Sequence, residues 1–287
     1  MVTVMHNLID LDSIAKNEKL PRSTILRCKT NNELQQRYYL YLPKSLSPST
    51  PLMISVHGIS RNARRHALRF SEYAEQYNVA LLAPRFSHKH FPDFQRLGRE
   101  KRGLRADHAL HNTLNEVRQR TALTHSPLYM FGYSGGGQFV HRYAMAYPSN
   151  IAKIAIGAAG WYTLPDEQVT FPYGIAPNKR LADLTFKKKC FLRIPTGVYV
   201  GELDNARDTS LRQSQKLDLQ QGITRIERAH HWINAMRTAA QEHGYNTTYH
   251  IETLPQSDHS FSRSVKHGRL AERVFEFLFN ENSPTKH

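Results

Sequence analysis

Strand-like and helix-like segments alternate along most of this sequence. The β-rich run PLMISVHG, from residue 51, leads into a segment, 62–77, whose apolar residues recur at helical spacing, and the β-rich run NVALLAPRF follows. Parallel strands need crossover connections, usually helices, and these helices cover both faces of the sheet. The alternation therefore predicts an α/β fold with a mostly parallel central sheet covered by helices on both faces.

The same pattern continues to the last apolar segment of the chain. Two earlier β-rich runs, STILRC and RYYLYLP, flank the turn-like KTNNE, which predicts a hairpin at one sheet edge. Asp107 is expected to be the N-cap of the helix over 107–121. Further strands are expected in LYMFGYS, IAKIAIGAAG, TGVYVGELD and TTYHIETLP, and further helices in GQFVHRYAMAY and over 225–243 and 270–279.

One large domain fits the length of 287 residues, because such a chain can bury a sizeable core. Neither a Gly/Ser-rich linker nor an internal repeat divides the sequence. We expect residues 1–22 to form a polar N-terminal arm and residues 23–287 to form a single domain. Segment 161–195 is rich in proline and aromatic residues and too long for an ordinary connection, so it is expected to be an insertion over the sheet. Whether this insertion is a lid or cap is left open by the sequence.

The chain is basic, with 39 Lys and Arg against 24 Asp and Glu, a net charge of +15. Such a surface attracts anions. The basic residues are spread along the chain, however, and no helix-turn-helix, zinc-finger or RNP pattern accompanies them, so we expect no specific nucleic-acid partner. The oligomeric state is left open by the sequence.

Two cysteines form no disulfide framework, and no stretch reaches the roughly 20 apolar residues of a membrane span. The first 20 residues also lack the apolar core of a signal peptide. We therefore expect a soluble, cytoplasmic protein.

Several histidine-rich stretches could suggest a metal site. These are 88–90, 230–231, and the trio of Asp107, His108 and His111. None of them forms an H-E-x-x-H or other complete ligand set, so surface or capping roles are expected and no metal is assigned.

The segment FGYSGGGQFVHR places Ser134 between glycines, after an apolar strand and before an amphipathic helix. Residues 132–136 match G-x-S-x-G, in which the glycines permit a strained turn that lifts the serine hydroxyl clear of the chain. The motif also occurs by chance in loops. Ser134 is a candidate nucleophile if a base and a third orienting group lie nearby.

Candidates for both groups follow later strands. His259, in LPQSDHSF, comes after the last β-rich run, and Asp204 closes the run VYVGELD. Asp208 and Asp258 compete with Asp204 for the orienting role. Asp208 lies further into its loop, and Asp258 adjoins His259 and is poorly placed to orient that ring. The order Ser134, Asp204, His259 is the order of the α/β-hydrolase template.

The early segment VHGIS supplies a sharp turn after a strand. Its Ile59 amide, together with the Gly135 amide, is a candidate oxyanion hole. A plain strand-ending glycine is the simpler interpretation of Gly58 alone.

With these residues, the sequence resembles the α/β-hydrolase-fold serine hydrolases over about residues 37–279. The elbow GYSGGG is similar to those of intracellular esterases and polyhydroxyalkanoate-depolymerase-like members. The resemblance implies that Ser134 forms an acyl-enzyme, that His259 is base and then acid, that Asp204 holds the imidazole, and that neither a metal nor an organic cofactor is needed.

The resemblance does not identify the substrate. A small-molecule carboxylic ester is the first hypothesis. A serine peptidase of the same fold is the alternative, and a non-catalytic basic binding protein on this scaffold is a third.

Residues near the expected catalytic edge are candidates for substrate binding. Aromatic residues of the insertion could line an acyl pocket or form its core, and arginines after VHGIS could bind an anionic substrate or face solvent. The candidates are Tyr133, Trp161, Tyr162, Phe171, Tyr173, Arg61, Arg64 and Arg65.

Overall fold

The computed structural model describes residues 8–10, 19–121, 123, 127–181 and 183–280. Within these residues one sheet has the strand order β1-β2-β3-β5-β4-β6-β7-β8-β9. The strands are β1 Leu8–Asp10, β2 Ile25–Lys29, β3 Arg37–Tyr41, β4 Leu52–Val56, β5 Ala80–Pro84, β6 Leu128–Tyr133, β7 Ile151–Gly157, β8 Thr196–Gly201 and β9 Tyr249–Leu254.

The sheet is parallel from β5 to β9, because each of these strands pairs in parallel with its neighbours β4, β6, β7 and β8. Strands β2 and β3 form the predicted hairpin, and β3 joins β5 in an antiparallel pair. The predicted α/β fold with a mostly parallel sheet is confirmed.

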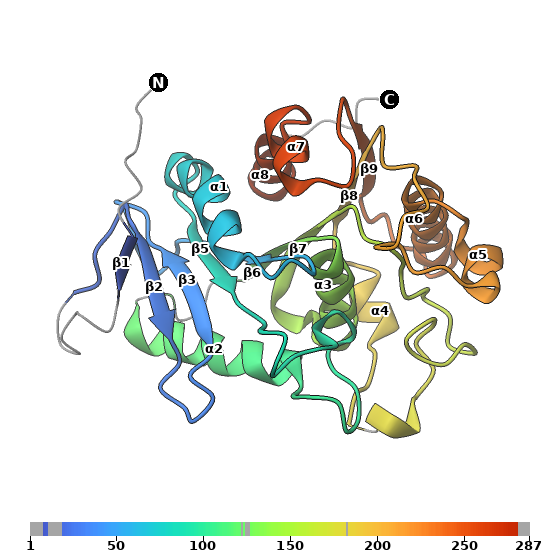
Figure 1. The fold of residues 1–287 in the computed structure, drawn as a ribbon, viewed down its shortest axis with the longest axis horizontal. Coiled ribbons are helices and arrows are strands. Elements are labelled where there is room, and N and C mark those ends of the chain that lie inside the picture. The colour runs from blue at the N-terminus through green and yellow to red at the C-terminus, as the bar shows by residue number, and fades with distance from the viewer. Residues whose placement is uncertain (1–7, 11–18, 122, 124–126, 182, 281–287) are drawn as a thin grey trace.

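Helices cover both faces of this sheet (Figure 1). One apolar core contains side chains from α2, α3 and α6, and a second contains side chains from α1 and α8. The helices are α1 Ala63–Gln76, α2 Ala106–Arg120, α3 Gly135–Ala146, α4 Lys188–Phe191, α5 Gln215–Gln221, α6 Arg225–Glu242, α7 Phe261–Lys266 and α8 Leu270–Phe279, with 3-10 turns η2 Phe94–Arg96, η3 Pro148–Asn150 and η4 Lys179–Leu181.

Strand β4 illustrates why the two faces form. Successive strand residues point to opposite faces, so Ile54 and Val56 enter the core with α2 and α3, whereas Met53 enters the core with α1 and α8. All five residues of β4 are buried. Four of these five residues are apolar because both faces of the strand pack against helices, and the fifth, Ser55, hydrogen-bonds to His66 Nδ1.

The prediction that Asp107 caps α2 is wrong. The helix begins at Ala106 after the cap residue Arg105, and Asp107 lies buried in its first turn. The Asp107 carboxylate accepts hydrogen bonds from the Arg105 guanidinium and from the Tyr147 hydroxyl. Its carboxylate therefore ties α2 to its surroundings instead of capping the backbone.

The expected N-terminal arm contains strand β1, which pairs in parallel with β2. Arg27 forms an ion pair with Asp10 across this pair. Residues 1–7 and 11–18 of the expected arm lie outside the described residues. The division at residue 22 stays a prediction.

The expected insertion, 161–195, connects β7 to β8 and includes η4 and α4. Phe171, Ile175 and Leu184 of this segment are buried in the core that contains α3 and α6. No helix in the described ranges is long and apolar enough to cross a membrane.

Candidate active site

Ser134 lies at the sharp turn between β6 and α3, at the carboxyl edge of the sheet. Its backbone has φ +55° and ψ −115°, a conformation that is strained for a residue with a side chain. Neighbouring glycines allow the turn to pack closely. A Cβ on Gly136 would lie 2.1 Å from the Val56 carbonyl oxygen, and one on Gly132 would lie 2.2 Å from the Gly136 carbonyl oxygen.

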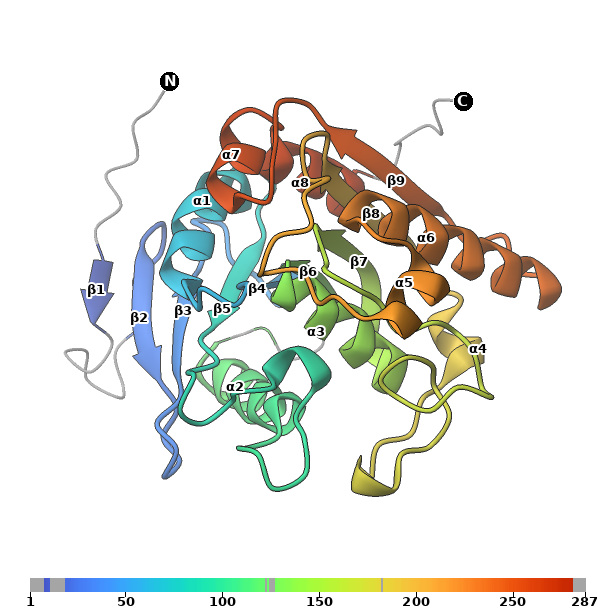
Figure 2. The same cartoon turned by 45° about the vertical axis from the view of Figure 1, so that its right-hand side comes forward.

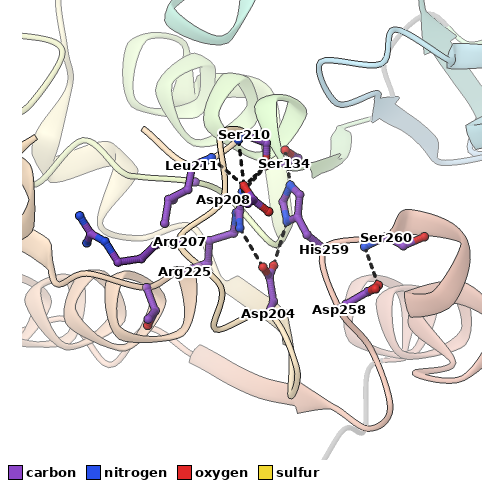
Figure 3. Close-up of polar contacts among 12 residues, drawn as sticks. Ser134, Asp204, Arg207, Asp208, Ser210, Leu211, Arg225, Asp258, His259 and Ser260 are labelled. Carbon is purple, nitrogen blue, oxygen red and sulfur yellow. Dashed lines mark hydrogen bonds and ion pairs between the residues drawn. The ribbon is translucent and has the colours of Figure 1, made fainter. Parts of the chain in front are cut away.

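His259 follows β9 and precedes α7. Its Nε2 lies 3.0 Å from Ser134 Oγ, and its Nδ1 lies 2.8 Å from Asp204 Oδ2 (Figure 3). Because a carboxylate only accepts hydrogen bonds, Nδ1 carries the proton and Nε2 is free to accept one from the serine.

Asp204 follows β8, and its side chain is buried. While Oδ2 accepts from His259, Oδ1 accepts from Arg225 Nη1 at 2.9 Å. The Arg225 guanidinium is itself only 1% exposed and also donates to Ser210 Oγ at 2.6 Å. The site therefore contains a buried Arg225–Asp204 ion pair behind the imidazole.

Asp208 and Asp258, the other candidates for the orienting role, form hydrogen bonds with residues other than His259. Asp208 accepts from the Ser210 amide and hydroxyl, and the Ser210 hydrogen bond, followed by Arg225, lowers the pKa of Asp208 to about 2. Asp258 accepts from the Ser260 amide (Figure 3) and also from the Arg263 guanidinium. Each carboxylate organises its own loop, and it is Asp204 whose carboxylate contacts the His259 ring.

The Ile59 and Gly135 amides lie close together beside Ser134. A Cβ on Gly135 would be 3.5 Å from the Ile59 nitrogen, and one on Gly58 would be 3.3 Å from Ser134 Cβ. Within the described part of the chain, neither amide donates a hydrogen bond to a backbone carbonyl. Both donors are available to a negatively charged oxygen at Ser134.

The His57 side chain holds the loop that carries Ile59 through two hydrogen bonds to the backbone. Its Nδ1 donates to the Gly58 carbonyl at 2.8 Å, and its Nε2 accepts from the Phe86 amide at 2.9 Å. Complete burial lowers the pKa of His57 to about 4, so the ring is neutral at pH 7. This role of His57 could not be predicted from the sequence, because nothing in VHGIS indicates which backbone groups the ring will meet.

Arg61 also has a structural role. Its guanidinium donates to the carbonyls of Phe86, Phe91 and Pro92 and lies 4.8 Å from the Phe94 ring centre. These bonds fix the segment after β5 against the oxyanion turn. The alternative of substrate binding is not supported for Arg61, because carbonyl oxygens occupy its donors.

A cavity of about 230 Å³ opens beside Ser134 and His259. Two of the predicted substrate-binding residues, Tyr133 and Arg65, line it. Tyr133 donates to or accepts from Ser264 Oγ at 3.0 Å, and Arg65 donates to Ser262 Oγ at 3.1 Å. The lining residues are Gly58, Ile59, Ser60, Asn62, Arg65, His66, Tyr133, Ser134, His259 and Phe261.

The other predicted substrate-binding residues do not line this cavity. Tyr162 is fully buried and stacks on Trp232 with ring centres 4.9 Å apart, so it belongs to the core. Phe171 packs on Phe186. Arg64 is exposed on α1. Trp161 is buried among arginines of other segments.

Among the described residues, no group of three or more His, Cys, Asp or Glu side chains lies close enough together to hold a metal ion. Asp107, the carboxylate of the trio considered above, is bound to Arg105. His230 and His231 are exposed on α6.

Comparison with known proteins places the fold. No family model matches the sequence, and no curated protein matches it. Among solved structures, poly(aspartic acid) hydrolase-1 from Sphingomonas sp. KT-1 superposes with a TM-score of 0.70 at 22% identity, over 85% of this chain and 93% of that one. A poly(3-hydroxybutyrate) depolymerase from Bordetella parapertussis gives 0.68 at 23% identity, over 88% and 86%.

An S-formylglutathione hydrolase from Agrobacterium tumefaciens is more distant, with a TM-score of 0.56 at 13% identity over 88% of this chain and 94% of that one. These neighbours share the α/β-hydrolase fold. This chain therefore has the α/β-hydrolase fold, as the resemblance in its sequence implied.

Proposed function

We propose that this protein is a serine hydrolase that cleaves carboxylic esters through an acyl-enzyme. The observation that carries the proposal is the continuous hydrogen-bond chain from Ser134 Oγ through the His259 ring to Asp204, with lengths of 3.0 and 2.8 Å. An isolated serine in a glycine-rich turn would need neither partner.

In the proposed reaction, His259 Nε2 takes the proton of Ser134 Oγ as this oxygen attacks the ester carbonyl carbon. The carbonyl oxygen becomes an oxyanion and accepts hydrogen bonds from the Ile59 and Gly135 amides. His259 then gives its proton to the leaving alcohol, and the C–O bond breaks to leave Ser134 acylated.

Deacylation repeats these steps with water as the nucleophile. His259 takes a proton from water, the hydroxide attacks the acyl carbon, and the proton returns to Ser134 Oγ as the acid leaves. Asp204 stabilises the imidazolium formed in both halves. The reaction uses protein groups and water, without a metal or organic cofactor.

The cavity favours a substrate with a small group beside Ser134. At about 230 Å³, the space beside Ser134 is smaller than the 300–1,000 Å³ of typical ligand sites, which suits a small acyl or alcohol group. The neighbouring structures include an esterase, which supports an ester as the substrate. A serine peptidase is the second candidate.

Hydrolysis of p-nitrophenyl butyrate and of the matching p-nitroanilide separates these candidates. We expect wild type to cleave the ester much faster, Ser134→Ala to lose at least about 10³-fold in kcat, and Ser149→Ala, which removes an exposed serine elsewhere, to match wild type. Faster cleavage of the anilide would favour the peptidase. A folded wild-type protein that cleaves neither compound would favour the binding-protein alternative.

A further inference from the structure

Three arginines surround one indole at the carboxyl edge of the sheet. The guanidinium carbons of Arg142, Arg96 and Arg212 lie 4.2, 5.4 and 5.4 Å from the ring centre of Trp161. Tyr173 packs on Trp161 with ring centres 5.2 Å apart, and its hydroxyl oxygen accepts a hydrogen bond from Arg212 Nη2 at 2.9 Å. We call these three arginines with Trp161 and Tyr173 the arginine cluster.

None of the three guanidiniums forms an ion pair with a carboxylate in the described part of the chain. Burial lowers the pKa of Arg96, and the charge of Asp93 opposes this effect only from a distance. Asp93, which precedes Arg96 by three residues, pairs instead with Arg99 and Arg102 at 3.1 and 3.2 Å. One cation on an indole face is a common structural stack. Three like charges on one ring repel one another.

Arg142 makes this repulsion costly, because its side chain is fully buried. It donates to the Gln95 carbonyl, Gln138 and Thr163, all neutral acceptors, while its Nη2 has no hydrogen-bond partner among the residues that the structure describes. Burial, and then the charges of Arg96 and Arg212, lower the pKa of Arg142 well below its usual range. A buried cation of this kind is normally paired.

The Arg96 Nε is likewise buried, and no described residue accepts a hydrogen bond from it. Arg212 is exposed, and Arg96 and Tyr173 are half-buried, so the cluster has a solvent-facing side. An anion on that side would supply the missing counter-charge and accept the unused donors. Guanidinium groups bind carboxylates and phosphates in this way, through charge-assisted hydrogen bonds.

The cluster adjoins the proposed nucleophile. The backbone amide of Gln138 donates to the Ser134 carbonyl, and its side-chain oxygen accepts from Arg142 Nη1 at 3.2 Å. Phe94, two residues before Arg96, packs over Gly135, since a Cβ on that glycine would lie 3.3 Å from Phe94 Cζ. Arg142 is eight residues after Ser134 on α3, a rise of about 12 Å, and helical side chains lean back toward the N-terminus.

Arg212 is linked to the same site through its loop. The segment between β8 and α5 runs beside α3 (Figure 2), and Leu211 would contact a Cβ placed on Gly160 at 3.9 Å. Asp208 and Ser210 of this segment bond to Arg225, which also holds Asp204. The loop that carries Arg212 is therefore anchored to the partner of the proposed orienting aspartate.

We propose that the arginine cluster binds an anionic group, a carboxylate or a phosphate, on the ester substrate about one to two helical turns from the bond that Ser134 attacks. This inference rests on the proposed function and names its substrate class. Arg212 and Arg96 contact the anion. The buried guanidinium of Arg142, which packs on the Trp161 ring, attracts the anion through its charge. Arg64 and Arg65 are the candidates from the sequence for binding an anionic substrate, whereas this proposal assigns the distal anion to the arginine cluster instead.

Kinetics with matched esters test the proposal. The substrates are the mono-p-nitrophenyl esters of adipate and suberate, which carry a distal carboxylate, and their neutral methyl esters. We expect wild type to favour the anionic esters in kcat/KM, and Arg212→Gln and Arg96→Gln to lose about tenfold on them while keeping neutral-ester turnover. Arg37→Gln, which removes an exposed charge from β3, is the matched control.

A binding assay separates this site from the proposed function. Ser134→Ala protein is titrated with adipate and with inorganic phosphate at constant ionic strength, and the fluorescence of its tryptophans is recorded. We expect a saturable change that weakens about tenfold in the Arg212→Gln background and persists in Arg37→Gln. A response to adipate identifies a carboxylate as the recognised group, and a response to phosphate alone identifies a phosphate.

The two assays fail in different ways. Saturable binding without turnover of any ester would refute the proposed function and leave the anion site standing. Equal turnover of anionic and neutral esters, with no change in Arg212→Gln, would refute the anion site and leave the hydrolase standing. The absence of saturable binding with both anions would also overturn the site.

Discussion

The carboxylate of Asp204 accepts hydrogen bonds from two partners at once. One oxygen accepts from His259 and the other from Arg225, and both Asp204 and Arg225 are buried. An unpaired carboxylate at this depth would pay a large desolvation penalty. The ion pair with Arg225 offsets this penalty and holds the Asp204 carboxylate toward the imidazole.

Asp204→Asn removes the acceptor that selects the His259 tautomer. We expect kcat to fall by about 10⁴-fold, the scale known for this change in a serine protease. Asp208→Asn is the matched control, because Asp208 also bonds to Arg225 but not to His259. Both variants are assayed with p-nitrophenyl butyrate after thermal unfolding confirms that they fold. If Asp208→Asn were the more damaged enzyme, Asp204 would not be the orienting residue.

Arg225 is expected to act as a positioning residue through Asp204. Arg225→Met leaves a buried carboxylate with one partner fewer, so we expect a loss of about 3–5 kcal/mol in the free energy of unfolding and a lower kcat. Arg225→Lys keeps the charge and should restore part of kcat at similar KM. Urea unfolding and steady-state kinetics measure both effects. Equal kcat in the two variants and wild type would limit Arg225 to stability.

Some residues could be predicted from sequence and others could not, for a physical reason. Ser134 and His259 follow strands whose apolar pattern is local, so their edge of the sheet follows from topology. Arg225 contacts Asp204 across 21 residues, and one arginine among many in a basic chain carries no local signal. Tyr162 and Trp161 are adjacent, yet one packs in the core and the other meets arginines, which depends on neighbours distant in sequence.

At the scale of elements, the crossing of the β6–α3 turn over the end of β4 decides where Ser134 lies. Backbone meets backbone there, with Gly136 against the carbonyls of Val56 and His57. The alternation of strands and helices predicts that α3 follows β6. The alternation does not predict how closely the β6–α3 turn approaches the end of β4. In the sequence, only the glycines of the G-x-S-x-G motif indicate this close approach.

Gly136→Ala should therefore disrupt the turn. Its Cβ would lie 2.1 Å from the Val56 oxygen, so we expect the free energy of unfolding to fall by about 3 kcal/mol and ester hydrolysis to be lost. Gly160→Ala is the control, because the nearest atom to its Cβ, at 3.4 Å, belongs to the Gln138 side chain. Thermal unfolding of both variants checks this. A Gly136→Ala protein as stable as Gly160→Ala would contradict the packing described here.

At the scale of the whole molecule, three buried histidines couple folding to pH. His57, His66 and His141 are buried, and burial is the first cause that lowers the pKa of each ring. His57 and His141 each donate from Nδ1 to a carbonyl and accept at Nε2 from an amide. Protonation would turn each of these acceptors into a donor that faces another donor.

The free energy of unfolding should therefore fall as pH decreases. Below about pH 6.5 the unfolded chain protonates its histidines, while His57 in the folded protein stays neutral down to about pH 4. Between pH 7 and pH 5, His57 alone should remove about 2 kcal/mol. Urea unfolding at several pH values measures this slope. Stability that is constant or rises toward pH 5 would contradict the burial of these neutral rings.

The central claim is that Ser134 is the nucleophile, and covalent labelling tests it without knowledge of the substrate. A fluorophosphonate is added to wild-type protein, and the modified residue is located by peptide mass spectrometry. We predict one adduct per chain, on Ser134, which Ser134→Ala abolishes and Ser149→Ala retains. A folded wild-type protein that remains unlabelled, or an adduct on another serine, would contradict the claim.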